Sequence, residues 1–162
     1  MKPGETLVIR WIAGSAFMSF FLDLGELEGE LLRTDANPVE PIRRSVFQLA
    51  LAQRLTLRVK VPDKPGVFPL LALGERSNLR CGVVLRSNPM LMVPDMQPQT
   101  DQWTNRLDFT QEKRLRAKGS PTPSAANNTI PVALTGPAPN YTWGLNNLFY
   151  PYRNPYWVEE RQ

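Results

Sequence analysis

The sequence of 162 residues contains no histidine and a single cysteine, Cys81. Histidine is the commonest general base near neutral pH and the commonest transition-metal ligand in proteins. Its absence excludes Ser-His and Cys-His catalytic arrangements anywhere in this chain. One cysteine cannot form an internal disulfide, and its place in the apolar segment LRCGVVL predicts a small buried side chain rather than a nucleophile.

Long apolar runs are absent as well. No stretch approaches the ~18 residues that a membrane-spanning helix needs, so we expect no membrane partner. The first residues, MKPGETLVIRWIAG, lack the pattern of a signal peptide, because Pro3 and Gly4 come at once and charged residues flank a short apolar stretch. The 19 basic and 15 acidic residues give a net charge of +4, which favours an anionic partner only slightly. We therefore expect no nucleic-acid partner, and a basic barrel that binds nucleic acid remains a weaker alternative.

Four acidic residues form the densest group of possible metal ligands: Asp23, Glu26, Glu28 and Glu30. They could hold a hard cation, but a calcium loop requires a fixed ligand spacing and a tight glycine that this stretch lacks. We interpret the group as a solvated loop. The sequence therefore provides no catalytic, cofactor-binding or metal-binding residue.

Basic residues and short motifs are equally weak as sites. The basic groups are Arg43 and Arg44, and then Lys113, Arg114 and Arg116. They lack interleaved aromatic residues, so a charged surface is the better interpretation than a nucleic-acid site. Glycine-rich phosphate loops are absent. The two N-glycosylation sequons, at residues 127–129 and 140–142, have meaning only in a eukaryotic secretory route.

Short strand-like segments dominate the first half of the chain. They cover residues 7–12, 16–24, 30–33, 45–49, 55–61, 67–73 and 79–85. The strongest is LTLRVKV at 55–61, in which apolar and polar residues alternate strictly. Prolines mark turns at Asn37-Pro38 and at Pro41. The spacing predicts an all-β sandwich or barrel.

Composition changes after this strand-rich part. Residues 1–88 are predicted to form the β-sandwich, and residues 89–130 a proline-rich linker with one helix near 107–118. Residues 131–162 contain two further strand-like segments. Because two strands cannot bury their own apolar face, we expect this part to be the incomplete start of a following domain.

The order of several short motifs resembles the middle domain of three-domain multicopper oxidases (laccase-like enzymes). Residues 7–24, followed by the Asp-Leu-Gly turn at 23–25, resemble the opening of that domain. Residues 35–39, Asp-Ala-Asn-Pro-Val, resemble its Asp-Gly-x-Pro-Val turn. Phe47 with Ala-Gln-Arg at 52–54 resembles its Phe-to-Gln-Arg run, with Thr56 where Asp is usual. The resemblance implies a Greek-key cupredoxin-like β-sandwich or barrel with a C-terminal extension that contains one short helix.

The resemblance continues beyond the sandwich. Residues 107–117 resemble the helix of the linker between the second and third domains, and residues 130–136 and 141–146 resemble the first strands of the third domain. Residues 154–162 resemble the segment before that domain's first histidine motif. The family holds four copper ions through histidines and one cysteine of its first and third domains. No such ligand has a counterpart here, and Cys81 has no flanking histidine, so we expect this chain to bind no copper.

Two functions follow as hypotheses. In the first, the chain is a non-catalytic middle-domain fragment of a periplasmic or extracellular oxidase, which couples one-electron oxidation of phenols or metal ions to reduction of oxygen to water. It would act as a spacer and docking scaffold between copper-bearing first and third domains, or would pair with another copy of itself. In the second, it is a free-standing copper-free interaction module, whose aromatic patch consists of Phe149, Tyr150, Tyr152, Tyr156 and Trp157. In both, Gln53 and Arg54 at the start of the best strand serve stability rather than activity.

Overall fold

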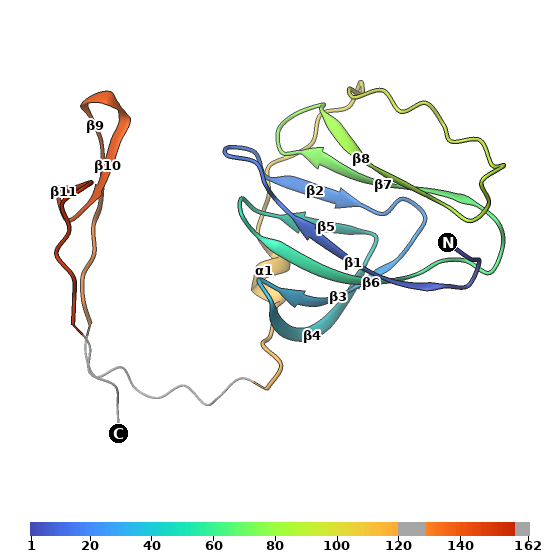
Figure 1. Cartoon of the computed structure of the whole chain (residues 1–162), viewed down its shortest axis with the longest axis horizontal. Helices are drawn as coiled ribbons and strands as arrows, with labels where there is room; N and C mark the ends of the chain where they lie inside the picture. Colours follow the sequence, from blue (N-terminus) through green and yellow to red (C-terminus); the bar gives the residue numbers. More distant parts are fainter. Residues whose placement is uncertain (120–128, 158–162) are drawn as a thin grey trace. The chain divides into compact units, whose positions relative to one another are not determined.

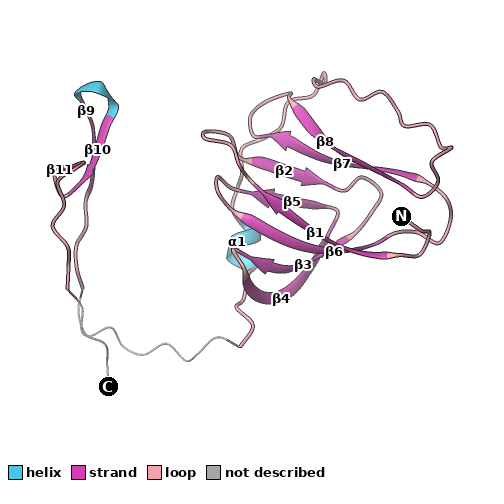
Figure 2. Ribbon diagram, in the orientation of Figure 1, coloured by secondary structure: helices cyan, strands magenta, loops and turns pink. Residues whose placement is uncertain are grey.

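The computed structural model describes residues 1–119 and 129–157. The chain divides into two compact units, Met1–Ser120 and Pro121–Gln162. The first unit consists of β-strands joined by loops, with one short helix (Figures 1 and 2). No helix among the described residues is long and apolar enough to cross a membrane.

Two antiparallel sheets of four strands each make up the first unit. One sheet contains β1 (Thr6–Ile12), β6 (Arg54–Lys60), β3 (Gly29–Thr34) and β4 (Asn37–Arg44), in that spatial order. The other contains β5 (Val46–Leu49), β2 (Phe20–Asp23), β7 (Val67–Gly74) and β8 (Arg80–Arg86). The all-β sandwich predicted from the sequence is confirmed.

The core lies between the two sheets and follows the alternation seen in the sequence. In β6, Leu55, Leu57 and Val59 are buried, whereas Arg58 and Lys60 are exposed. The opposite sheet contributes Phe47 from β5 and Phe68 from β7, both at most 1% exposed. Burial of each such side chain stabilises the fold by about 1.5–3 kcal/mol. The strict alternation therefore predicted the inward face of β6 correctly.

Residues 37–44 form a strand, so the prediction that Asn37-Pro38 and Pro41 mark turns is wrong. β4 lies at the edge of its sheet, where a proline without an N–H is tolerated. The turn that precedes it is Asp35-Ala36, and both of these residues have positive φ, 47° and 70°. Two-residue hairpin turns require this backbone conformation.

Two further elements are shorter than predicted. The segment 16–24 forms a strand only from Phe20, because the Ser15 hydroxyl accepts hydrogen bonds from the backbone N–H groups of Phe17 and Met18 and holds a turn there. The predicted helix at 107–118 is confined to α1 (Thr110–Arg114). Leu115 has an extended backbone, and the chain beyond it pairs with the edge strand β4.

The linker segment, defined here as residues 89–119, belongs to the first unit and lies against its two sheets. Leu79 and Gln99 form an antiparallel bridge near β8, and Val39 and Ala117 form another at β4. Figure 1 shows the segment running from β8 back along the unit to α1. The segment is therefore attached to both sheets of the sandwich.

The second unit contains a small antiparallel sheet with the order β11-β10-β9. Its strands are β9 (Leu134–Ala138), β10 (Thr142–Leu145) and β11 (Leu148–Phe149), with the 3-10 turn η1 (Pro139–Tyr141) between β9 and β10. Two strands were predicted here and three are present. The third arises because Asn146 and Asn147, both with positive φ, form a two-residue turn.

Candidate functional site

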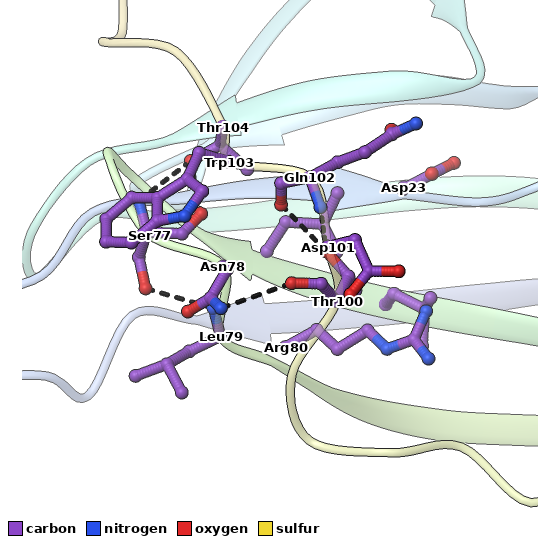
Figure 3. Close-up of a pocket in the computed structure, with 12 residues that line it drawn as sticks. Asp23, Ser77, Asn78, Leu79, Arg80, Thr100, Asp101, Gln102, Trp103 and Thr104 are labelled. Atoms are coloured by element: carbon purple, nitrogen blue, oxygen red, sulfur yellow. Dashed lines mark hydrogen bonds between the residues drawn. The ribbon is translucent and has the colours of Figure 1, made fainter.

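A pocket of about 470 Å³ lies where the linker segment crosses β7 and β8 (Figure 3). The linker supplies its outer wall through Thr100, Asp101, Gln102, Trp103 and Thr104. The strands and the loop between them supply the floor, and the side chain of Asp23 lies at one end. The pocket contains carboxylates, amides and hydroxyls, but no histidine and no cysteine.

The polar groups of this pocket bind the linker to the sandwich. The Asn78 side-chain amide donates to the carbonyl of Thr100 at 3.1 Å. The Thr104 hydroxyl donates to the Gly74 carbonyl and accepts from the backbone N–H of Ser77 at 3.3 Å. Figure 3 shows the Asn78 side chain directed toward the backbone of the linker at Thr100, whereas Thr104 belongs to the linker and bonds to the end of β7 and the loop after it. These hydrogen bonds give the pocket the geometry of an attachment between the linker and the sandwich.

A second attachment joins α1 to the edge strand β5. The backbone N–H of Gln48 donates to Oε1 of Gln111 at 2.9 Å, and Nε2 of Gln111 donates to the carbonyl of Gln48 at 2.9 Å. Gln111 is 1% exposed, so both bonds are shielded from water. The Gln111 side chain thus occupies the position that a neighbouring strand would take at this edge. We call this pair the glutamine clamp.

Asp108 extends the clamp toward the surface. Its Oδ1 accepts from the Gln48 side-chain amide at 2.6 Å and from the backbone N–H of Thr110 at 3.0 Å. These hydrogen bonds, with that of Gln48 the strongest cause, lower the pKa of Asp108 from 3.8 to about 2. The carboxylate that accepts these hydrogen bonds therefore stays ionised to a lower pH than an ordinary aspartate. Sequence analysis gave no signal for this clamp, since its two glutamines lie 63 residues apart.

The acidic group of the sequence is not gathered into one site. Asp23 ends β2 and accepts a hydrogen bond from the backbone N–H of Gly25 at 2.8 Å, whereas Glu30 lies in β3. The Glu30 carboxylate pairs with Arg58 at 2.5 Å and with Arg43 at 3.8 Å. The role of Glu30 in cross-strand ion pairs was missed, because it depends on the pairing of β3 with β6 and β4.

Cys81 is exposed, so the prediction of a buried side chain is wrong. It lies in β8, which is the edge strand of its sheet, opposite Ala72 of β7. An edge strand has a neighbouring strand on one side only, so its residues are less covered than those of a central strand. The apolar residues next to Cys81 in the sequence do not indicate whether its strand is central or at an edge.

The predicted basic groups are surface residues without a shared pocket. Arg43 reaches Glu30, while the side chain of Arg116 donates to the carbonyls of Lys113 and Leu115. The sequon at residues 127–129 lies largely outside the described residues. Asn140 of the other sequon is exposed in η1.

Gln53 and Arg54 hold the loop before β6. The Gln53 side chain accepts from the backbone N–H of Ala50 at 3.0 Å, and the backbone N–H of Arg54 donates to Asp35 at 3.0 Å. Both contacts are structural, as expected for residues that start the strongest strand.

A groove of about 650 Å³ on the second unit is lined by four aromatic residues, Trp143, Tyr150, Tyr152 and Tyr156, whereas Phe149 and Trp157 of the predicted patch lie outside its lining. The hydroxyl of Tyr156 accepts a hydrogen bond from the Asn146 amide at 2.6 Å. Tyr150 and Trp157 are 89% and 90% exposed, and Phe149 is half-buried. The predicted patch is thus present on this unit, except that Phe149 turns partly inward.

The side chains present do not fit a copper ion. Imidazole and thiolate ligands hold copper in proteins, and this sequence has no histidine and one cysteine. Within residues 1–119 and 129–157, no three Cys, Asp or Glu side chains come together as a metal-binding group. No chemical step through copper can therefore be assigned to residues of this chain.

Comparisons with known proteins relate the chain to copper oxidases. No family model matches the sequence. The multicopper oxidase MmcO of Mycobacterium tuberculosis is 30% identical over 158 residues, which are 95% of this chain and 30% of that protein. The chain thus spans about 30% of the length of this curated relative.

Two solved structures have the same fold. Fet3p, a multicopper oxidase that functions in iron import, matches 83% of this chain and 27% of its own, with a TM-score of 0.66 at 17% identity. The laccase of Botrytis aclada matches 91% of this chain and 28% of its own, with a TM-score of 0.57 at 13% identity. The resemblance in sequence motifs, the curated relative and the cupredoxin-like all-β fold agree, and together they support the assignment of the chain to the multicopper oxidase family.

Proposed function

We propose that this chain is the non-catalytic middle portion of a multicopper oxidase and serves as a spacer and docking scaffold between copper-bearing domains. The proposed boundaries are a sandwich at 1–88, a linker at 89–130 and the start of a following domain at 131–162. The parent oxidase would couple one-electron oxidation of phenols or metal ions to the reduction of oxygen to water, outside the cytoplasm.

The observation that carries this proposal is the attachment of the linker segment to the sandwich. The glutamine clamp fixes α1 on β5. Farther along, the backbone N–H of Glu40 donates to the carbonyl of Arg116 at 2.8 Å, and that of Lys118 donates to the carbonyl of Pro38 at 3.0 Å. A connector held at both sheets leaves the sandwich at a defined point, whereas a flexible connector would not.

The absence of a catalytic constellation supports the same role. A scaffold needs stability and a fixed exit for the chain, and it needs no ligand of its own. The 30% share of the relative's length is what one of three domains would cover. The copper ligands would then come from the neighbouring domains.

The experiment is to determine the sequence that flanks this chain in its genome. We expect an in-frame His-x-His segment before it and a His-Cys-His segment after it. Flanking sequence without such segments would overturn the scaffold proposal. If the segments are present, copper content of the full parent should fall in a Gln111→Ala variant and stay unchanged in a Gln102→Ala control, because Gln102 is exposed on the linker surface.

A second function is supported by the groove of the second unit. Its exposed rings, including Trp143, Tyr150 and Tyr152, suit a free-standing module that binds an apolar partner. Analytical ultracentrifugation of the purified chain tests the version in which the partner is a second copy. Concentration-dependent dimers that Tyr150→Ser abolishes would favour the module, and a monomer at all concentrations would not.

A further inference from the structure

Three arginines lie together on the outer face of the first sheet. Arg10 comes from β1, Arg33 from β3 and Arg54 from the first position of β6. All three are exposed. Arg10 and Arg54 are 44 residues apart in the sequence, and only the strand order β1-β6-β3 makes the three arginines neighbours.

Thr56 of β6 lies at the centre of this group. It pairs with Arg10 across β1 and with Arg33 across β3. Because Leu55 and Leu57 on either side of it are buried, the Thr56 side chain faces outward with the two arginines. Neighbouring strands are ~4.8 Å apart, so the backbones of Arg10 and Arg33 lie about 10 Å apart with Thr56 between them.

A groove of about 470 Å³ opens at this place. Its lining includes the three arginines and Thr56, and Ile12 and Ala36 complete the rim. Sites for small ligands typically have volumes of about 300–1,000 Å³. The groove therefore has room for a small molecule.

The charges in the groove are only partly balanced. Asp35 lies 3.3 Å from the Arg54 guanidinium and neutralises it. Arg33 donates from Nη1 to the carbonyl of Ala36 at 3.2 Å, which orients the guanidinium without neutralising it. Among the described residues, Arg10 and Arg33 form no ion pair with a carboxylate.

Other cations of the same face are balanced differently. Arg58 and Arg43 both pair with the carboxylate of Glu30. Glu30 balances one of these two charges, and Lys60 of β6 lies exposed on the same face. Within the groove itself, Arg10 and Arg33 are the arginines without a carboxylate partner. Guanidinium groups bind carboxylate and phosphate oxygens through paired N–H donors, and two of them side by side favour a ligand with two negative charges.

We propose that the groove between β1, β6 and β3 binds a small oxyanion with at least two negative charges, a phosphate or a polycarboxylate. Arg10 and Arg33 hold the oxygens from two sides, and the Thr56 hydroxyl donates from the floor. Arg54, fixed by Asp35, closes the end of the groove. This site is separate from the linker attachments and does not rest on the proposed scaffold role.

The test is isothermal titration of the full chain with pyrophosphate and, separately, with citrate. We expect at least one of them to bind with 1:1 stoichiometry and a dissociation constant below about 1 mM in a buffer of about 50 mM NaCl. Binding of pyrophosphate would identify the ligand class as phosphates, and binding of citrate would identify it as polycarboxylates. Arg10→Gln and Arg33→Gln should each weaken binding by about tenfold or more.

Two further variants make the result specific. Arg43→Gln removes the same charge from the same face but lies outside the groove, so its affinity should match that of the parent chain. Thr56→Asp places a carboxylate between the two arginines and should abolish binding while the chain stays folded by circular dichroism. The proposal is overturned if neither anion binds, if Arg43→Gln weakens binding as much as Arg10→Gln, or if Thr56→Asp binds normally.

Discussion

Replacement of Gln111 by alanine tests the most specific structural feature of the chain, the glutamine clamp. Gln111 is 1% exposed and makes two hydrogen bonds of 2.9 Å to the backbone of Gln48, which is itself 9% exposed. The alanine side chain can make neither bond. The backbone N–H and carbonyl of Gln48 would then lose their partners at a buried edge of β5.

The size of the effect follows from these two groups. A buried polar group left without a partner costs about 1–3 kcal/mol. Two such groups would cost about 2–6 kcal/mol, and some entry of water into the space left by the side chain places the expected loss near about 3 kcal/mol. That loss is a large part of the ~5–15 kcal/mol by which domains are stable.

Urea unfolding followed by tryptophan fluorescence measures the change. Gln102→Ala is the matched control, because Gln102 is exposed, and we expect it to change the free energy of unfolding by less than about 0.5 kcal/mol. Gln111→Glu sharpens the test, since it keeps the shape but replaces the Nε2 donor by an oxygen that faces the Gln48 carbonyl. If Gln111→Ala were no more destabilising than the control, the clamp would not hold the linker as described.

Three other predictions concern the first unit. Hydrogen bonds lower the pKa of Asp108 from 3.8 to about 2 in the folded chain, so the stabilisation that they provide is present above pH 3.8 and is lost as the pH falls through about 2. Melting temperatures measured across this range should therefore fall less for Asp108→Asn than for the parent chain, and equal slopes would contradict the assignment. Gln53→Ala removes the bond to the backbone N–H of Ala50 and should lower the free energy of unfolding by about 1 kcal/mol in urea titrations, whereas an unchanged midpoint would count against it. Cys81 is exposed, so a thiol reagent should label it stoichiometrically in the native chain, and labelling only in denaturant would show that β8 is covered.

The parts of the fold that follow from local pattern were predictable. The strict alternation of apolar and polar residues predicted the strand β6 and its buried residues, Leu55, Leu57 and Val59. The same kind of reasoning failed at β4, because prolines end a central strand but are accepted in an edge strand. Whether a strand is central or at an edge is a property of the whole sheet and has no signature in a short segment.

The attachments and the groove depend on contacts between distant segments. Gln48 and Gln111 meet only because the linker segment returns along β5. Arg10 and Arg33 become neighbours only because β6 lies between their strands. A single sequence shows none of these contacts.

Composition alone predicts that this chain binds no copper, since a chain without histidine cannot provide the imidazoles that such sites require. Family membership followed from the order of short motifs and is supported by the relatives. The attachment of the linker to both sheets could not be predicted from the sequence and is seen only in the structure. Together these observations support a scaffold role for this portion of the oxidase.

Copper loading of the purified chain tests the account most directly. After incubation with copper and removal of the excess, we expect no blue absorbance, less than about one copper ion in ten chains by elemental analysis, and no oxygen consumption with a phenolic substrate. A stoichiometric blue copper complex, or oxidase activity that follows the copper content, would contradict the claim that this chain is a copper-free scaffold.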